Sequence, residues 1–171
     1  YMQKPLFREI CARAYGSDTP IACYRAMFMN KPAGKGTYLP WHQDRFGILD
    51  LDPVATVWTA LDRATVENGC VGMVPGSHRS SIEQDDSVSF AFLTDEQAAT
   101  VLAEAEPEYL ELEAGESALL HNWMLHGSGV NKTETPRRGF SVCYMDAATK
   151  SDTGKTFSTI FGEGALSPES L

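Results

Sequence analysis

Several common signals are missing from this 171-residue chain. Its four cysteines (Cys11, Cys23, Cys70 and Cys143) include no CxxC pair, which predicts reduced thiols in a cytoplasmic protein rather than a disulfide framework. No apolar run approaches the roughly 20 residues that a membrane-spanning helix needs. Positive charge is also scarce. With 14 Lys and Arg against 23 Asp and Glu, the net charge of −9 disfavours nucleic acid and membrane surfaces as partners.

Histidine is equally scarce, with four residues, and one lies in the segment Trp41-His42-Gln43-Asp44. Residues 38–44 have the composition of a strand end, and alternate side chains on a strand share one face. We therefore expect the His42 imidazole and the Asp44 carboxylate to lie side by side. Such a pair is two thirds of the 2-His-1-carboxylate set that holds non-haem Fe(II). Alone the motif is weak, because a surface histidine and a turn aspartate give the same pattern.

A third metal ligand has to come from another part of the chain. His126 is the strongest candidate, because the arginine pair Arg137 and Arg138 follows it. His121 precedes His126 by five residues, an odd offset that would place it on the opposite face of a continuous strand. A structural hydrogen bond is expected for His121. His78 lies in a turn and is interpreted as structural or substrate-facing, not as a ligand.

The arginine pair suggests a co-substrate with a carboxylate group. A guanidinium can hold a carboxylate through two parallel hydrogen bonds, a geometry that an ammonium group does not match. Neighbours on a strand point to opposite faces, so only one of Arg137 and Arg138 is expected to face a pocket. The pattern alone leaves open which one. A His-x-Asp pair, a distant His and a following Arg, in this order, indicate an iron oxygenase that also uses an organic acid.

The predicted elements favour an all-β domain. Helices are expected only near residues 4–14 and 94–105. Short strand patterns, separated by Gly and Pro turns, recur at 21–29, 38–44, 55–60, 70–74, 109–112, 117–121 and 139–145. This pattern predicts a sandwich or jelly roll, in which distant residues meet at the open mouth between two sheets. Residues 1–171 are expected to form a single domain, truncated at the N-terminus because a helical pattern begins almost at Tyr1.

Five parts of the chain together resemble the phytanoyl-CoA dioxygenase family. The matching segments are Met27–Pro32, Trp41–Asp44, Trp58–Leu61, Asn68–Cys70 with Pro75–His78, and His126–Arg137. The likeness extends from about residue 21 to residue 146. The resemblance implies a double-stranded β-helix, a cupin-like jelly roll with a few flanking helices, and a longer N-terminal part than this chain has.

Carried over position by position, the resemblance implies that His42, Asp44 and His126 bind the catalytic iron. It also implies that Arg137, and not Arg138, binds the far carboxylate of 2-oxoglutarate. Further side chains implied to contact this co-substrate are those of Met27, Gln43, Trp58 and Ser128. From strand context alone, the Met and Trp of this set are interpreted as core packing.

The function implied by the resemblance is that of a dioxygenase that uses Fe(II), 2-oxoglutarate and O2. Asp44 is present, whereas related halogenases lack this carboxylate, so hydroxylation of an unactivated C–H bond of a small organic substrate is favoured. Two alternatives are desaturation or epimerisation at the same iron site, and a metal-binding jelly-roll module without turnover. The substrate and the oligomeric state are left open, and loops 45–53 and 78–92 are expected to select the substrate.

Overall fold

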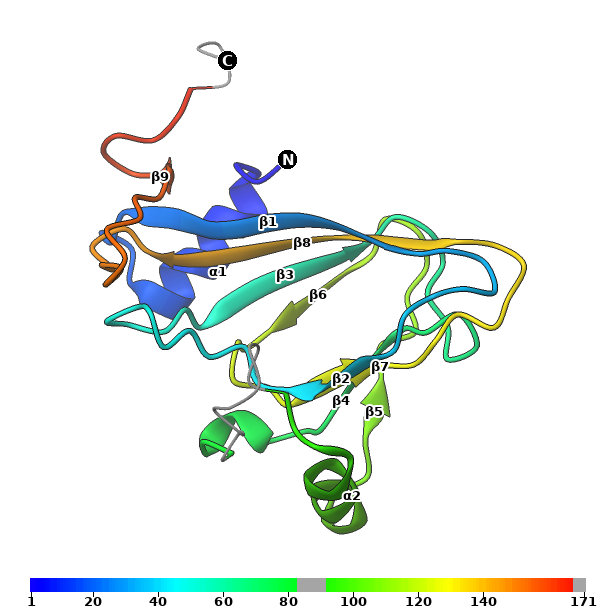
Figure 1. Ribbon diagram of the computed structural model, residues 1–171. Helices are drawn as coiled ribbons and strands as arrows, with labels where there is room; N and C mark the ends of the chain where they lie inside the picture. Colours follow the sequence, from blue (N-terminus) through cyan, green and yellow to red (C-terminus); the bar gives the residue numbers. More distant parts are fainter. Residues whose placement is uncertain (83–91, 168–171) are drawn as a thin grey trace.

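The computed structural model describes residues 1–82 and 92–167, so most of the predicted substrate-selecting loop 78–92 lies outside the described residues (Figure 1). Two antiparallel sheets face one another. The larger contains, in order, β6 (Ser117–Leu120), β3 (Ala55–Ala60), β8 (Arg137–Asp146), β1 (Ile21–Lys31) and β9 (Thr159–Phe161). The smaller contains β2 (Leu39–His42), β7 (His126–Ser128), β4 (Val71–Met73) and β5 (Glu108–Tyr109). The predicted double-stranded β-helix is confirmed.

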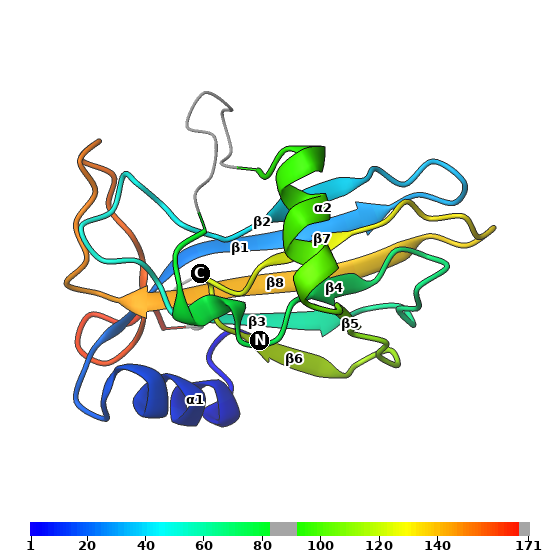
Figure 2. The same cartoon turned by 90° about the horizontal axis from the view of Figure 1, so that it is seen from below.

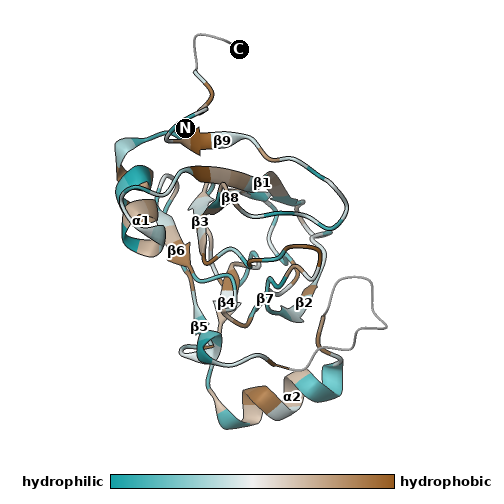
Figure 3. Cartoon of the chain, turned by 90° about the vertical axis from the view of Figure 1, so that its left-hand side faces the viewer, coloured by the Kyte–Doolittle hydropathy of each residue, from teal (hydrophilic) through white to brown (hydrophobic). Residues whose placement is uncertain are grey.

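Helices cover the outer faces of both sheets. Helix α1 (Pro5–Tyr15) packs against the larger sheet, whereas α2 (Asp95–Glu104) crosses the outside of the smaller one (Figures 2 and 3). A short 3-10 helix, η1 (Ser77–Arg79), follows β4. The N-terminus of α2 is fixed by a capping box, since Thr94 and Gln97 each bond the other's backbone N–H. No helix in the described ranges is long and apolar enough to cross a membrane.

The two faces of the larger sheet differ because successive side chains alternate. All six residues of β3 are buried. Val57 faces outward and packs with Phe7 of α1 and Val142 of β8 in the main apolar cluster. Thr56 and Trp58 face inward and line a cavity between the sheets. The apolar core under α1 therefore leaves the space between the sheets free for a site.

The observed strands depart from the predicted ones where they are short. Strand β2 ends at His42, so Gln43 and Asp44 lie beyond it, and the expectation that a strand carries residues 42 to 44 is wrong. Strands β7 and β9, with three residues each, were not predicted as separate elements. A strand of two or three residues offers too few positions to show alternation, so only its pairing partners define it.

Candidate metal centre

A cavity of about 830 Å³ between the two sheets brings the predicted site residues together. This volume lies within the range of small-molecule sites. All eight residues predicted from the sequence line it: Met27, His42, Gln43, Asp44, Trp58, His126, Ser128 and Arg137. Both sheets contribute to the set, so its assembly depends on the tertiary fold.

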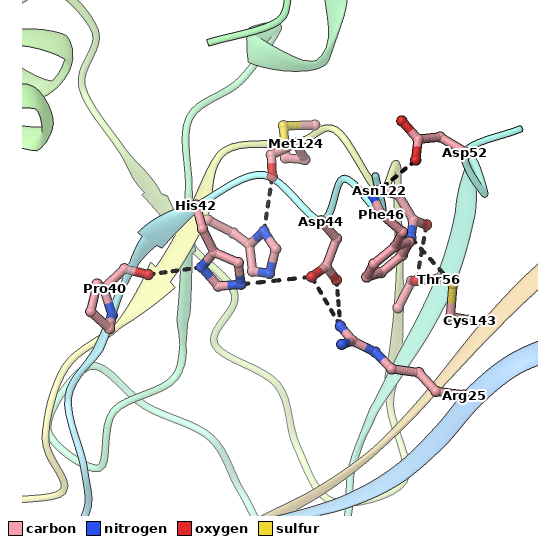
Figure 4. A network of polar contacts seen from close by, with 11 residues as sticks. Arg25, Pro40, His42, Asp44, Phe46, Asp52, Thr56, Asn122, Met124 and Cys143 are labelled. Carbon is pink, nitrogen blue, oxygen red and sulfur yellow. Dashed lines mark hydrogen bonds and ion pairs between the residues drawn. The ribbon is translucent and has the colours of Figure 1, made fainter. Parts of the chain in front are cut away.

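The two imidazoles meet because β2 pairs with β7 and places His42 directly opposite His126. Their ring centroids lie 4.2 Å apart. In each ring Nδ1 bonds the backbone carbonyl two residues earlier, that of Pro40 or Met124, at 2.8 Å (Figure 4). A carbonyl only accepts, so in the neutral form of each ring Nδ1 carries the proton and Nε2 keeps a free lone pair. Both rings are thus fixed in the tautomer that a metal ligand requires.

Asp44 joins this pair from the loop after β2. Its Oδ1 lies 3.8 Å from Nε2 of His42, and the ligand atoms of His42, Asp44 and His126 all lie within 4.8 Å of one another. The backbone N–H of Asp44 donates to the Asn122 carbonyl at 2.8 Å, and Nη2 of Arg25 donates to both carboxylate oxygens (Figure 4). Two imidazoles and one carboxylate so placed fit a divalent metal such as Fe(II).

The protonation state of His42 suits metal binding. Burial, and after it the neighbouring His126, lower the pKa of His42 from 6.5 to about 4. At neutral pH the imidazole is therefore uncharged, the form that coordinates metals.

The same shift predicts a pH dependence of stability. Between about pH 6.5 and 4 the unfolded chain binds a proton at His42 that the folded chain does not, so stability falls as the pH drops through this window. We expect His42 to lower the free energy of unfolding by up to about 3 kcal/mol at pH 4 relative to neutral pH. Urea unfolding of the metal-free wild type and of His42→Gln at the two ends of this window would measure it. An equal pH dependence in both proteins would contradict the assignment.

Arg137 and Arg138 point in opposite directions at the start of β8, as the alternation predicted. Arg137 is 2% exposed, and its Nη2 donates to the Gly69 carbonyl. Arg138 is exposed and forms two side-chain hydrogen bonds to Asp62, each 2.7 Å long. Only Arg137 lines the cavity.

The end of the cavity at Arg137 contains hydrogen-bond donors without acceptors. Nε of Arg137 and Nε1 of Trp58 are both buried and have no partner among the described residues. The guanidinium carbon lies 5.5 Å from the Trp58 ring centre, and burial lowers the pKa of Arg137. No acidic side chain in the described part of the chain forms an ion pair with Arg137. A buried cation with unused donors fits an anionic group such as a carboxylate.

Gln43 lines the cavity, but its side-chain amide forms hydrogen bonds with the backbone of other segments. It is 1% exposed, and its amide nitrogen lies within hydrogen-bond distance of the carbonyls of Ser77, Ser80 and Trp123. Its amide oxygen accepts from the backbone N–H of Ile82. These contacts tie the loop after β2 to η1 and its surroundings. They indicate that Gln43 holds the loop after β2 in place. The contact of Gln43 with a co-substrate stays a prediction.

The other two histidines stand apart from the cluster. Nδ1 of His121 accepts a hydrogen bond of 3.0 Å from the Trp123 backbone, the structural role expected for it. His121 also lines the cavity. His78 lies on η1 with its ring 5.1 Å from that of His121. Neither histidine belongs to the group of candidate ligands.

Asn122 has a supporting role that the sequence analysis missed. Its backbone carbonyl holds Asp44, as described above. Its side chain accepts a hydrogen bond of 3.0 Å from the Thr56 hydroxyl and donates to Sγ of Cys143 at 3.2 Å (Figure 4). The loop that carries Asp44 is thereby attached to β3 and β8 of the larger sheet.

Two cationic residues of β1 were also missed, although the sequence contains a signal for them. Arg25 and Lys31 are separated from Met27 by even numbers of residues, so strand alternation places all three on the cavity face. Lys31 is buried, and its Nζ donates to the carbonyls of Thr37 and Gly129. Cationic residues at both ends of this alternating set, on the inner face of a strand, are a sequence signal for a polar cavity.

Comparisons of the sequence with known proteins point to one family. The family model described as phytanoyl-CoA dioxygenase (PhyH) matches residues 2–139. The human peroxisomal phytanoyl-CoA dioxygenase is 30% identical over 135 residues, which cover 74% of this chain and 40% of the human protein. The chain thus spans less than half the length of this curated relative.

Solved structures share the fold. A non-heme monooxygenase, ThoJ, in a complex with nickel is 26% identical, with a TM-score of 0.71 over 96% of this chain and 60% of its own. The epimerase SnoN, in complex with Fe3+, alpha ketoglutarate and nogalamycin RO, is also 26% identical, with a TM-score of 0.71 over 98% of this chain and 69% of its own. The Fe3+ and alpha ketoglutarate bound to SnoN are the metal and the co-substrate expected for this family. With the family model matching more than half of its residues, this chain belongs to the phytanoyl-CoA dioxygenase family of iron- and 2-oxoglutarate-dependent oxygenases.

Proposed function

We propose that this chain forms the catalytic core of a dioxygenase that hydroxylates an unactivated C–H bond of a small organic substrate. The observation that carries the proposal is a single cavity that holds both a two-imidazole, one-carboxylate cluster and a buried guanidinium without an acidic partner. His42, Asp44 and His126 would hold Fe(II), and Arg137 would bind 2-oxoglutarate. The bound metal supplies the oxygen chemistry, and the chain supplies position and a water-poor cavity.

The buried donors support a co-substrate and not only a metal. A buried charge without an oppositely charged partner destabilises a protein, and Arg137 bonds the neutral Gly69 carbonyl while its Nε has no acceptor among the described residues. This environment favours an anion bound beside Arg137. A carboxylate there would accept hydrogen bonds from Arg137 Nε and Trp58 Nε1. Met27 and Ser128 line the same cavity and would contact the co-substrate. A metal-binding module without turnover has no need of such an anion site.

Epimerisation at the same site is the second candidate. It is favoured by one observation: SnoN, whose structure matches 98% of this chain at 26% identity, is described as an epimerase. Hydroxylation and epimerisation both remove hydrogen from a C–H bond and differ in what is returned to the carbon. A product heavier by one oxygen atom supports hydroxylation, an unchanged mass supports epimerisation, and a loss of two hydrogens supports desaturation.

The experiment that tests the proposal begins without oxygen. Fe(II) and 2-oxoglutarate added anaerobically to the protein are expected to give a weak visible charge-transfer band, because His42, Asp44 and His126 would hold the metal in the same cavity in which Arg137 would bind the co-substrate. Succinate release in air, stimulated by members of a small-molecule panel, would then identify substrates for product mass spectrometry. Tight iron binding with no such band would favour the metal-binding module instead.

We also propose a cytoplasmic location, based on the four free cysteines. The human relative is described as peroxisomal. Imaging of a tagged full-length protein separates the two compartments.

A further inference from the structure

Arg25 contacts the candidate metal ligand Asp44 from the opposite sheet. Its Nη2 donates to Oδ1 at 2.9 Å and to Oδ2 at 2.8 Å (Figure 4). Oδ1 is also the oxygen that lies 3.8 Å from Nε2 of His42. One guanidinium of β1 therefore fixes how the carboxylate is turned toward the imidazoles of the smaller sheet.

A β-bulge in β1 gives Arg25 this position. The register with β8 shifts between Cys23 and Arg25, which pair with the consecutive residues Tyr144 and Cys143, so Tyr24 is an extra residue. Cys23 consequently packs on the α1 side of the sheet, whereas Tyr24 and Arg25 both line the cavity. Bulges next to active sites commonly redirect a side chain in this way.

The guanidinium is held in place by aromatic packing as well. Its central carbon lies 5.2 Å from the ring centre of Phe46, which follows Asp44 by two residues in the same loop. The Tyr24 ring in turn lies 4.2 Å from the Phe46 ring. Within the described residues, Asp44 is the only hydrogen-bonding or ionic partner of Arg25. Among the described residues, the guanidinium of Arg25 therefore forms polar contacts with one candidate ligand, Asp44.

We propose that Arg25 is the positioning residue for Asp44. The proposal rests on the function proposed above, because it takes Asp44 as a metal ligand. Hydrogen bonds from Arg25 hold the Asp44 carboxylate in one orientation before a metal binds. Metal binding then loses less affinity to the entropy of fixing this side chain. A positive charge near a divalent cation also repels it. The two effects have opposite signs: loss of positioning weakens metal binding, whereas loss of charge alone strengthens it.

Mn(II) binding, measured by electron paramagnetic resonance, separates the two effects. Arg25→Met removes both the hydrogen bonds and the charge, and we expect Mn(II) to bind about 10- to 100-fold more weakly than to the wild type. The visible spectrum of the Co(II)-loaded variant is expected to change, because the carboxylate is no longer held in one orientation. Arg25→Lys should recover part of the affinity, since its ammonium ends one bond short of Nη2.

Arg45→Met is the matched control. Arg45 follows Asp44 directly and lines the cavity, but its side chain contacts Ser81 and Asp52 and not Asp44. Removing its charge should leave the Mn(II) affinity unchanged or slightly increased. Comparison of the two arginine variants therefore isolates the contact with the carboxylate.

Wild-type or tighter Mn(II) binding by folded Arg25→Met would overturn the positioning role. Thermal unfolding of each metal-free variant reports whether it is folded. Should Arg25→Met not fold, Arg25→Gln takes its place with the same expected loss, because its amide is too short to reach Asp44. Failure of the proposed function looks different, since wild-type protein would then not bind Mn(II) in a manner that depends on His42 and His126.

Discussion

Asp44→Ala is expected to abolish substrate-stimulated succinate formation while the fold survives. Asp44 is the single carboxylate of the candidate ligand cluster, and two imidazoles alone would hold a divalent metal weakly, without a negative charge to offset that of the ion. The loss should exceed the roughly 10- to 100-fold effect of changing a residue that only orients a ligand. The fold should persist because Arg25, left without its partner, is 35% exposed and can be hydrated.

The matched control for this variant is Asp62→Ala. Asp62 also bonds an arginine, Arg138, but it does not line the cavity. Its removal should leave succinate formation near the wild-type rate. Circular dichroism and thermal unfolding of both variants would establish that each is folded. Activity of Asp44→Ala close to that of the wild type would refute the metal assignment.

Arg137→Met is expected to weaken 2-oxoglutarate binding by roughly one to two orders of magnitude, from the roughly 1.5–3 kcal/mol of a charge-assisted hydrogen bond. The variant should remain folded, because it replaces a buried cation that lacks an acidic partner with an apolar side chain of similar length. Titration of the anaerobic Fe(II) protein with 2-oxoglutarate measures the change. The affinity for Mn(II) alone should not fall.

Arg138→Met is the control next in sequence. It removes the same charge from the outer face of β8, where Arg138 bonds Asp62, and should leave 2-oxoglutarate affinity unchanged. A ligand that binds only the folded state raises the unfolding temperature. 2-Oxoglutarate with Mn(II) should therefore stabilise Arg138→Met as it does the wild type, and Arg137→Met much less. Equal stabilisation of both variants would exclude Arg137 as the co-substrate anchor.

Much of the fold could be predicted from local sequence. Residues 55–60 are rich in strand-forming side chains and form β3, and the capping residues Thr94 and Gln97 begin α2 where the pattern placed a helix. The opposite orientations of Arg137 and Arg138 followed from strand alternation alone. These features are local, since propensity, capping and alternation act over a few residues.

The residues of the candidate site could be predicted from the sequence, but the contacts that place them could not. His42 and Asp44 do have adjacent ligand atoms, but Asp44 lies beyond the strand and is placed by Asn122 and Arg25. Both of these contacts join segments that are far apart in the sequence. The bulge at Tyr24 also escaped prediction, because it is defined only by the register of β1 against β8.

The sequence by itself determined the chemistry available to this protein: few histidines, one His-x-Asp pair, an arginine on the inner face of a strand, and the likeness to an oxygenase family. Only the tertiary structure decided that β2 and β7 pair with His42 opposite His126, and that Arg25 reaches the carboxylate from the other sheet. The physical reason is that side-chain type and alternation are local properties, whereas the register between strands results from the packing of the whole domain.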